Sequence, residues 1–282
     1  MLSDAKNVKR GFAEGARYAI LCLLSVGFLL PFVWMMVTAL KPLNQVFTYP
    51  IQWIPRPFVW KNFAVGWSKL PFTTYLRNTV LVTGFGILGT VMSCSLVAYG
   101  FARLRFPGKN ALFLVLMATM MLPMQVTIIP LFLIYRKIGW IDTLYPLIVP
   151  AFFAGNPFFV FLLRQFFLTI SPELEDAAKI DGCNSFTIFT RIFLPLSKPA
   201  QVSVLIFSFM HFWNDFFLPL IFLNSESRKT LSLGLADLKG LYYTEWNLVM
   251  AVTVLSVLPC AVLFLACQKY FVTGIATSGL KG

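Results

Sequence analysis

Long runs without a charged residue dominate this sequence. A helix rises about 1.5 Å per residue, so roughly 20 apolar residues cross a hydrocarbon core about 30 Å thick. Transmembrane β-strands would instead show alternating segments of about 10 residues, and the runs here are continuous. The pattern therefore predicts membrane-spanning helices. The five longest runs are Tyr18–Leu40, Asn78–Ala102, Asn110–Tyr135, Thr143–Leu163 and Trp246–Gln268.

A sixth apolar stretch, Ala200–Leu223, is interrupted only by Asp215. Of the 282 residues, 58% are hydrophobic and 12% are charged, whereas a soluble domain carries about 25% charged residues. This composition excludes a soluble enzyme, a disordered chain and a fibrous repeat. We predict an all-α polytopic membrane protein in which residues 1–282 form one transmembrane domain. The six expected spans are about 18–40, 79–101, 111–135, 144–163, 200–223 and 246–268, with proline kinks above all in the third and fourth.

Basic residues beside the spans indicate the orientation, because loops rich in Lys and Arg stay in the cytoplasm. The N-terminal tail carries four of them and the second loop carries Arg103, Arg105 and Lys109. We therefore expect both termini in the cytoplasm and an uncleaved first span, although the first external loop is basic too. The formal net charge of +12 is explained by basic loop residues that lie beside anionic lipid headgroups. Nucleic-acid binding is not expected, because the basic residues are scattered.

The segment between spans four and five, residues 164–199, is the most charged part of the chain. Its pattern predicts a helix–turn–helix. Ser171 is a candidate N-cap before Pro172, acidic residues follow in the first turn, and Gly182 can end the helix. The second helix begins near Asn184 or Ser185 and is expected to stop at Pro195. Two roles for the first helix remain open: it could dock in a groove on a partner protein, or it could lie on the lipid headgroups. Its acidic first turn disfavours contact with anionic headgroups.

This segment resembles the EAA signature of ABC-importer permease subunits. The matching residues are Asp176-Ala177-Ala178, then Gly182 after three residues, and then Ile192 and Leu194-Pro195. Asp176 replaces the leading glutamate of the signature, and Glu175 precedes it. The resemblance extends to the shorter, six-span permease subunit of maltose-type importers. It is carried there by Asn78-Thr79, Tyr99–Gly108, Leu122–Pro130 and Trp213-Asn214-Asp215.

The resemblance implies a bacterial or archaeal cytoplasmic membrane protein with several partners. These are a second homologous permease, two ATPase subunits that bind ATP and Mg²⁺, and an extracytoplasmic solute-binding protein. Pro172–Asp181 would be the coupling helix seated in one ATPase, and the spans would move by alternating access. The chain itself has no G-x-x-x-x-G-K-[ST] motif, so we expect no enzyme activity and no bound cofactor. The expected coupling residues are Glu175, Asp176, Ala177, Ala178, Asp181 and Gly182.

Polar residues inside the fifth span form a candidate translocation site. His211, Asn214 and Asp215 would share one helical face with Leu218, and a carboxylate in lipid is expected to face the bundle or a water-filled path. A structural hydrogen bond is the equal alternative, and a proton relay is a third. In the third span, Met117, Met120, Met121 and Met124 could add a flexible lining, with Met121 as the candidate pathway residue; gap-filling in the core is the alternative. No metal site is expected, because His211 is the only histidine and no cysteines form a C-x-x-C pair.

Glycines in the second span, Gly84, Gly86 and Gly89, spell a dinucleotide-binding pattern. That motif needs a strand before it, so close helix–helix packing is the better interpretation. In the last external loop, Leu233, Gly234 and Leu235 would lie near the tip and contact the binding protein, as the resemblance implies. The resemblance therefore implies that the chain would form half of the membrane translocation pathway for a sugar or oligosaccharide. The alternatives are a glycerol-phosphate importer and an ion-coupled secondary transporter that uses Asp215 and His211.

Overall fold

The computed structural model describes residues 2–240 and 243–279, with side chains for residues 14–240 and 243–268. Every regular element in these ranges is a helix, which agrees with the all-α prediction. The chain divides into two compact units. One reaches to Leu70 and resumes over Leu238–Val257; the other comprises Pro71–Asp237 and the residues from Leu258 on.

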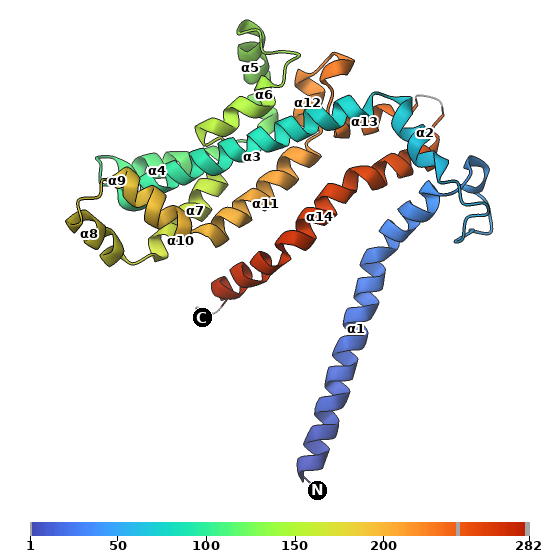
Figure 1. The fold of residues 1–282 in the computed structure, drawn as a ribbon, viewed down its shortest axis with the longest axis horizontal. Coiled ribbons are helices and arrows are strands. Elements are labelled where there is room, and N and C mark those ends of the chain that lie inside the picture. The colour runs from blue at the N-terminus through green and yellow to red at the C-terminus, as the bar shows by residue number, and fades with distance from the viewer. Residues whose placement is uncertain (1, 241–242, 280–282) are drawn as a thin grey trace. The chain divides into compact units, whose positions relative to one another are not determined.

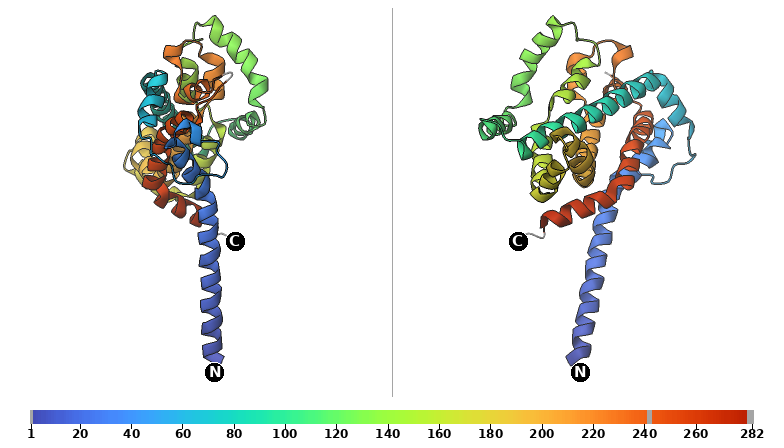
Figure 2. Two further views of the ribbon diagram at one scale, coloured as in Figure 1. Left: turned by 90° about the vertical axis from the view of Figure 1, so that its right-hand side faces the viewer. Right: turned by 60° about the vertical axis from the view of Figure 1, so that its left-hand side comes forward.

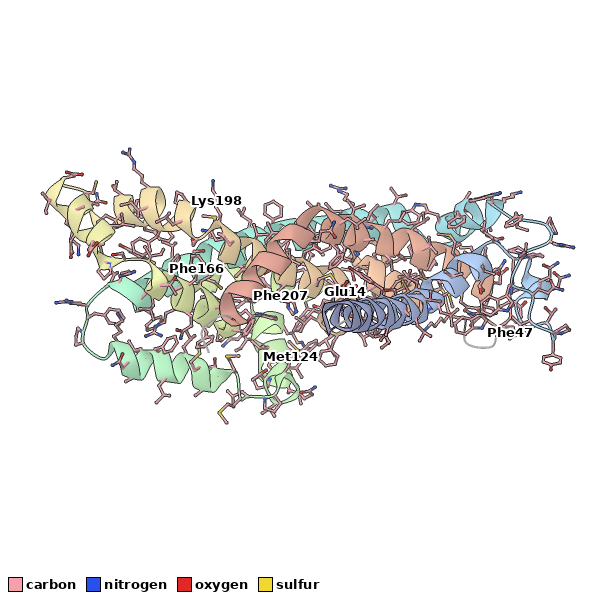
Figure 3. All side chains as sticks on the ribbon, turned by 90° about the horizontal axis from the view of Figure 1, so that it is seen from below. Glu14, Phe47, Met124, Phe166, Lys198 and Phe207 are labelled. Carbon is pink, nitrogen blue, oxygen red and sulfur yellow. The ribbon has the colours of Figure 1, made fainter. Side chains whose placement is uncertain are left out.

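The first unit contains a small core of its own. Ala39, Ala251 and Val254 are buried together, and the buried Asn62 side chain donates 2.8 Å hydrogen bonds to the carbonyls of Ala39 and Lys41. The long helix that begins the unit, labelled at Glu14 in Figure 3, buries none of its most apolar window within the chain. The elements are α1 (Leu2–Ala39), η1 (Leu43–Gln45), α2 (Lys61–Lys69) and the first part of α14 (Trp246–Gly279).

The second unit is built around one long helix, α3 (Phe72–Arg103), which packs against α7 and α11 (Figure 1). Several of the other helices are short because prolines and polar residues interrupt the apolar runs. These elements are α4 (Lys109–Thr119), α5 (Met124–Lys137), α6 (Tyr145–Ile148), η2 (Val149–Phe153), α7 (Pro157–Thr169), α8 (Pro172–Ile180), α9 (Ser185–Ile188), the π-helical η3 (Phe189–Phe193), α10 (Leu194–Leu196), α11 (Lys198–Asn214), α12 (Phe217–Phe222), η4 (Glu226–Arg228) and α13 (Leu231–Asp237).

Two of the three glycines in the second predicted span allow close packing. A Cβ added to Gly86 would lie 2.7 Å from the ring of Phe212, and one added to Gly89 would lie 2.6 Å from the ring of Phe152. Gly84 has no atom within 4 Å of the corresponding position. The packing interpretation is therefore confirmed for Gly86 and Gly89, and the partners are aromatic rings rather than other small residues.

Four helices are long and apolar enough to cross a membrane: Glu14–Ala39, Phe72–Arg103, Tyr145–Thr169 and Trp246–Gln268. They coincide with the first, second, fourth and sixth predicted spans. The third predicted span is instead a pair, α4 and α5, bent by 97° (Figure 2). Pro123 precedes α5 in an extended conformation, and the residue before a proline is itself disfavoured in a helix. The predicted kink is therefore a break.

The fifth predicted span is also interrupted. Helix α11 ends at Asn214, and Asp215 adopts an extended backbone with ψ 121°. The Asp215 carboxylate accepts a 3.3 Å hydrogen bond from the backbone N–H of Leu218, as short acidic side chains do where they compete with a helix. The prediction that His211, Asn214, Asp215 and Leu218 share one continuous helical face is therefore wrong.

A second bent pair, at 78°, joins Ser185–Leu196 to Lys198–Asn214. The chain therefore has four candidate spans, or up to six if each bent pair counts as one span. The sequence predicts that the helix beginning at Ser185 stops at Pro195, and it ends one residue later, at Leu196, so this prediction is confirmed to within one residue. The helix widens into a π-helical turn, η3, and continues through Leu196. Such a wider turn accommodates the irregular hydrogen bonding that a proline requires.

Candidate functional site

The segment from residue 164 to residue 199, here called the α8 loop, folds as its sequence predicts at both helix starts. The Ser171 hydroxyl accepts a hydrogen bond from the N–H of Glu173 at 3.3 Å, and the Asn184 side chain accepts one from Thr187 at 2.8 Å. Gly182 has a φ of +79°, a left-handed conformation that glycine adopts at low cost. The predicted N-cap, first-turn proline and glycine terminator are therefore confirmed.

Helix α8 has one face turned into the protein and one face exposed. Side chains of Glu175 and Asp176 are adjacent in sequence, yet their exposed fractions are 12% and 71%. Ala178 is buried, whereas Ile180 is 87% exposed. Of the expected coupling residues, Asp176, Ala177, Asp181 and Gly182 lie at the surface, and Glu175 and Ala178 point inward.

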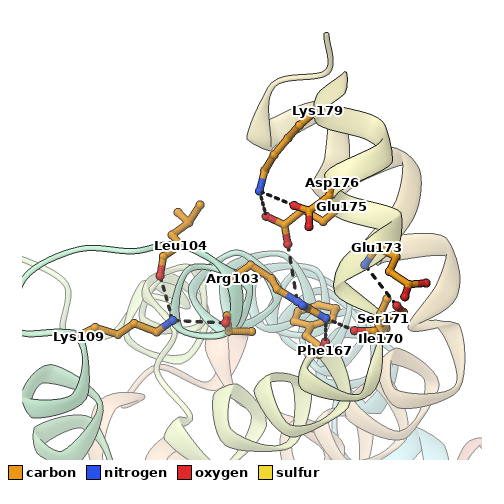
Figure 4. A network of polar contacts seen from close by, with 11 residues as sticks. Arg103, Leu104, Lys109, Phe167, Ile170, Ser171, Glu173, Glu175, Asp176 and Lys179 are labelled. Atoms are coloured by element: carbon orange, nitrogen blue, oxygen red, sulfur yellow. Dashed lines mark hydrogen bonds and ion pairs between the residues drawn. The ribbon is translucent and has the colours of Figure 1, made fainter. Parts of the chain in front are cut away.

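Arg103, at the C-terminal end of α3, fixes this inner face (Figure 4). Its guanidinium donates hydrogen bonds to the backbone carbonyls of Phe167, at 2.7 Å, and Ile170. Its Nε lies 4.0 Å from a carboxylate oxygen of Glu175. The side chain is 9% exposed. Because these partners belong to the end of α7 and to α8, one arginine joins three helices.

An aromatic cluster lies next to Arg103. The Tyr99 ring contacts Phe167, Phe189 and Phe193 with centroid separations of 6.4, 5.1 and 5.1 Å, and the Arg103 guanidinium lies 4.9 Å from the Phe193 ring centre. All four rings are buried. Their apolar burial fixes the α8 loop to α3 and α7, since buried aromatic pairs favour such edge-on and tilted arrangements.

The solvent side of α8 carries a small charge network. Lys179 contacts Glu175 at 2.9 Å and Asp176 at 3.5 Å. The hydrogen bond with Glu175, followed by the attraction of both carboxylates, raises the pKa of Lys179 above its usual value. Because Lys179 is exposed, solvent screens these contacts and they contribute little to stability. Glu175 is therefore shared between an exposed lysine and a buried arginine.

A cavity of about 460 Å³ lies in the second unit where broken helices meet. The break before α5, the break before α7 and the end of α11 all contribute to its wall. Helix ends leave backbone polar groups without helical partners, and membrane proteins use such interruptions to line polar cavities. No Lys, Arg, Asp or Glu is found among the described residues of the cavity wall. It is lined by Thr90, Met120, Met124, Ile128, Leu131, Tyr135, Pro146, Leu147, Pro150, Ala151, Gly155, Asn156, Pro157, Phe159, His211, Phe212, Leu218 and Phe222.

Of the four predicted pathway residues, only His211 lines this cavity. The Asn214 side chain donates to the carbonyl of Met210 at 2.9 Å, and the Asp215 carboxylate accepts the N–H of Leu218 in the first turn of α12. Met121 is 83% exposed, while its neighbours Met120 and Met124 line the cavity; Figure 3 labels Met124. Of the predicted methionine lining, Met120 and Met124 therefore line the cavity and Met121 does not. Among the described residues no group of three His, Cys, Asp or Glu side chains could hold a metal ion.

The segment that joins α12 to the end of the second unit, residues 223–237, is here called the α13 loop. It is tied to the N-terminal end of α3. Asn78 donates 2.9 Å hydrogen bonds to the carbonyls of Ser227 and Lys229, and the Thr79 hydroxyl accepts one from the N–H of Leu231 at 2.8 Å. These α3 residues bind the loop's backbone, so they fix its path whatever side chains it carries.

The three residues predicted at the tip of this loop belong to α13. Leu233 is 4% exposed and Gly234 is buried, where an added Cβ would lie 2.2 Å from the Tyr75 ring; Leu235 is partly exposed. The expectation that Leu233 and Gly234 lie near an exposed tip is therefore wrong. Local polarity suggested a flexible loop, but the tertiary contact with α3 buries this helix. The exposed part is residues 224–228.

Asp142 connects the α13 loop to the segment between α5 and α6. Its carboxylate accepts hydrogen bonds from the backbone N–H groups of Asn224, at 2.9 Å, and Ser225, at 2.8 Å, and from the Ser225 hydroxyl. The Ser225 hydroxyl is the main reason that the pKa of Asp142 lies below its usual value. Asp142 has a φ of +61°, which aspartate tolerates better than most residues. No periodicity in the sequence marks this residue.

Comparisons with known proteins show which family this chain resembles. The family of binding-protein-dependent transport system inner membrane components matches residues 92–277. The chain is 35% identical to the probable ABC transporter permease protein YurM of Bacillus subtilis (strain 168), covering 100% of this chain and 93% of that protein. It is 32% identical to the arabinooligosaccharides transport system permease protein AraQ of the same organism, covering 92% and 93%.

The fold also matches a solved structure. The crystal structure of a bacterial ABC transporter that imports the acidic polysaccharide alginate aligns with a TM-score of 0.81 at 23% identity, covering 91% of this chain and 95% of that one. At that identity the likeness concerns the fold. The chain belongs to the family of binding-protein-dependent transport system inner membrane components. Its resemblance to ABC-importer permease subunits is confirmed.

Proposed function

We propose that this chain is one of two permease subunits of an importer for sugars or oligosaccharides, with α8 as the helix that docks on an ATPase subunit. The observation that carries the proposal is the two-faced geometry of α8 in a member of this family. Its inner face is fixed by Arg103 and the aromatic cluster, and its outer face presents Asp176 and Ile180. An exposed helix face of this kind suits a groove on a partner.

The remaining parts of the importer follow from this assignment. A second homologous permease completes the pathway, two ATPase subunits bind and hydrolyse ATP with Mg²⁺, and a binding protein delivers the solute on the other side of the membrane. The chain spans the cytoplasmic membrane six times with both termini inside. Closure of the ATPases moves α8 and drives alternating access.

Docking is tested by paired substitutions of exposed isoleucines. Ile180→Asp places a charge on the outer face of α8, where the native side chain is 87% exposed, and should abolish copurification of the ATPase from detergent. Ile54→Asp is the matched control, because Ile54 is 63% exposed in a different loop. Full recovery of the ATPase with Ile180→Asp would refute docking through this face.

The proposed substrate class rests on the relatives' names and on the cavity. AraQ is named for arabinooligosaccharides, and the cavity wall combines polar Thr90, Asn156 and His211 with aromatic rings, a combination that suits hydroxyl groups and apolar ring faces. Because the described residues of the wall include no Lys or Arg, a neutral solute fits better than a phosphate ester.

The cavity's role is tested within the reconstituted importer. The probe is the oligosaccharide that raises the melting temperature of the partner binding protein. His211→Ala should raise the KM for its uptake, whereas Met121→Ala should leave it unchanged, because His211 lines the cavity and Met121 does not. An unchanged KM in both variants would remove the cavity from the pathway.

The α13 loop is the proposed contact for the binding protein. Its exposed residues 224–228 provide the contact surface, while Leu233, Gly234 and Leu235 support that surface from α13. Arg228→Glu should weaken binding-protein stimulation of ATP hydrolysis without altering hydrolysis in its absence. Equal stimulation of the variant and the parent importer would contradict this contact.

A further inference from the structure

Arg103 has a buried donor, its Nε, that makes no hydrogen bond to the described residues. Two of its hydrogen bonds go to the carbonyls of Phe167 and Ile170 at the end of α7. Its Nε is buried and has no hydrogen-bond partner among the described residues. The nearest carboxylate, Glu175 on α8, is 4.0 Å away, at the limit of an ion pair. The contact between Arg103 and α8 is therefore electrostatic, with room to shorten.

We propose that Arg103 and Glu175 form an internal clasp that makes α8 move together with the ends of α3 and α7, and that Asp176 is the acidic residue left to face the ATPase. The proposal rests on the function given above, because it assigns α8 to ATPase docking. The two adjacent acids then have different tasks. Glu175 is 12% exposed and turned toward Arg103, while Asp176 is 71% exposed.

Arginine suits this position for a chemical reason. Its planar guanidinium presents five donors in fixed directions, so one side chain can hold two carbonyls and still direct Nε at a carboxylate. A lysine carries its three donors on one nitrogen and could not reach the same set from the end of α3. The clasp is also sensitive to loss of either member, because a buried charge without its partner is strongly unfavourable.

A second arginine nearby offers a matched control. Arg164, on α7, donates a 3.2 Å hydrogen bond to the carbonyl of Phe101 near the end of α3, and its guanidinium lies 4.2 Å from the ring centre of Phe113. It therefore resembles Arg103 in binding a backbone carbonyl and an aromatic face. No ion pair between Arg164 and α8 occurs in the described part of the chain.

The experiment compares Arg103→Gln, Glu175→Gln and Arg164→Gln in the complete importer in liposomes. Solute uptake per ATP hydrolysed should fall about tenfold in the first two variants, a typical size for coupling between sites, and stay unchanged in Arg164→Gln. Copurification of the ATPase should persist in all three. The Arg103→Gln/Glu175→Gln double variant should lose no more than either single variant, and Arg103→Lys should recover part of the loss.

Each outcome has a defined meaning. If the importer with Arg103→Gln fails to assemble, the Glu175→Gln variant tests the clasp instead, because it leaves the two hydrogen bonds from Arg103 to the end of α7 in place. Normal uptake per ATP in Glu175→Gln overturns the clasp. Losses that add in the double variant also overturn it, because independent sites behave in that way. Retention of the ATPase by Ile180→Asp would instead refute docking, so the two failures are distinguishable.

Discussion

The two ends of α3 hold two loops by different means. At the N-terminal end, the neutral side chains of Asn78 and Thr79 bind the backbone of the α13 loop. At the C-terminal end, the charged side chain of Arg103 binds α8 through a carboxylate on Glu175. The first attachment uses neutral hydrogen bonds, whereas the second combines Arg103 hydrogen bonds and a buried aromatic cluster with an ion pair at 4.0 Å. The comparison shows a loop held by neutral hydrogen bonds at one end and a helix held by a charged contact at the other.

One continuous helix separates these attachments. Helix α3 has 32 residues, and at about 1.5 Å per residue it is roughly 48 Å long, enough to exceed a hydrocarbon core of about 30 Å. It contains no proline, and the packing at Gly86 and Gly89 holds its middle against Phe212 and Phe152. In the proposed importer α3 therefore connects the binding-protein side to the ATPase side within one element.

The largest expected effect is at the α13 loop's closest contact with α3. Gly234→Ala would place a Cβ 2.2 Å from the buried Tyr75 ring, and such overpacking costs about 1–3 kcal/mol. We expect a lower melting temperature in detergent and loss of uptake. Gly84→Ala is the control, because nothing lies within 4 Å of its added Cβ. Equal melting temperatures for the two variants would contradict the tight packing.

The next effect distinguishes two threonines one turn apart on α3. Thr79→Val leaves the buried N–H of Leu231 without an acceptor, which costs about 1–3 kcal/mol. Thr83→Val removes a buried hydroxyl that has no hydrogen-bond partner among the described residues and should be neutral or stabilising. Denaturant unfolding of both variants measures the difference. A larger loss in Thr83→Val would show that the loop is not held through Thr79.

A smaller effect is expected at the start of α8. Ser171→Ala removes the hydroxyl that accepts the N–H of Glu173, and loss of such a cap costs about 1 kcal/mol. Hydrogen exchange of the α8 amides should become faster, while exchange in α3 stays the same. Faster exchange throughout both helices would indicate that α8 is not an independent unit attached by its inner face.

The smallest effect depends on pH. Because Asp142 has a lowered pKa in the folded chain, its stabilising contribution is present above its ordinary pKa and disappears as the pH falls through the lowered value. The parent chain should therefore melt slightly higher than Asp142→Asn at pH 6, and the difference should vanish in strong acid. A difference independent of pH would contradict a charged tether between Asp142 and Ser225.

Local features of the sequence predicted local structure well. Charge-free runs located four long helices, and Ser171 and Gly182 correctly marked the start and end of α8. Asp215 shows where that reasoning fails, because its carboxylate can accept a backbone N–H and end a helix whose apolar pattern continues. The Arg103–Glu175 contact joins segments far apart in the chain, so no spacing rule reveals it.

The same limit explains the errors at the proposed sites. Met121 and the neighbouring methionines are the same residue type, so the sequence cannot distinguish them. Only the helix break before α5 determines which of them line the cavity. Leu233 and Gly234 sit in a polar, glycine-containing segment that resembles an exposed loop, and the contact with Tyr75 on α3 buries them. In both cases a tertiary contact determines where the residue lies, whereas a sequence pattern predicts only local secondary structure.

The central claim is that α8 and the end of α3 move as one body. It is tested most directly by the spin–spin distance between labels at Leu104→Cys and Glu173→Cys, an exposed position of α8 outside the proposed docking residues, in an assembled importer whose native cysteines are replaced. The distance should stay the same when ATP closes the ATPases, and it should broaden or shift when Arg103→Gln is added. An ATP-dependent change of this distance with Arg103 intact would contradict the account.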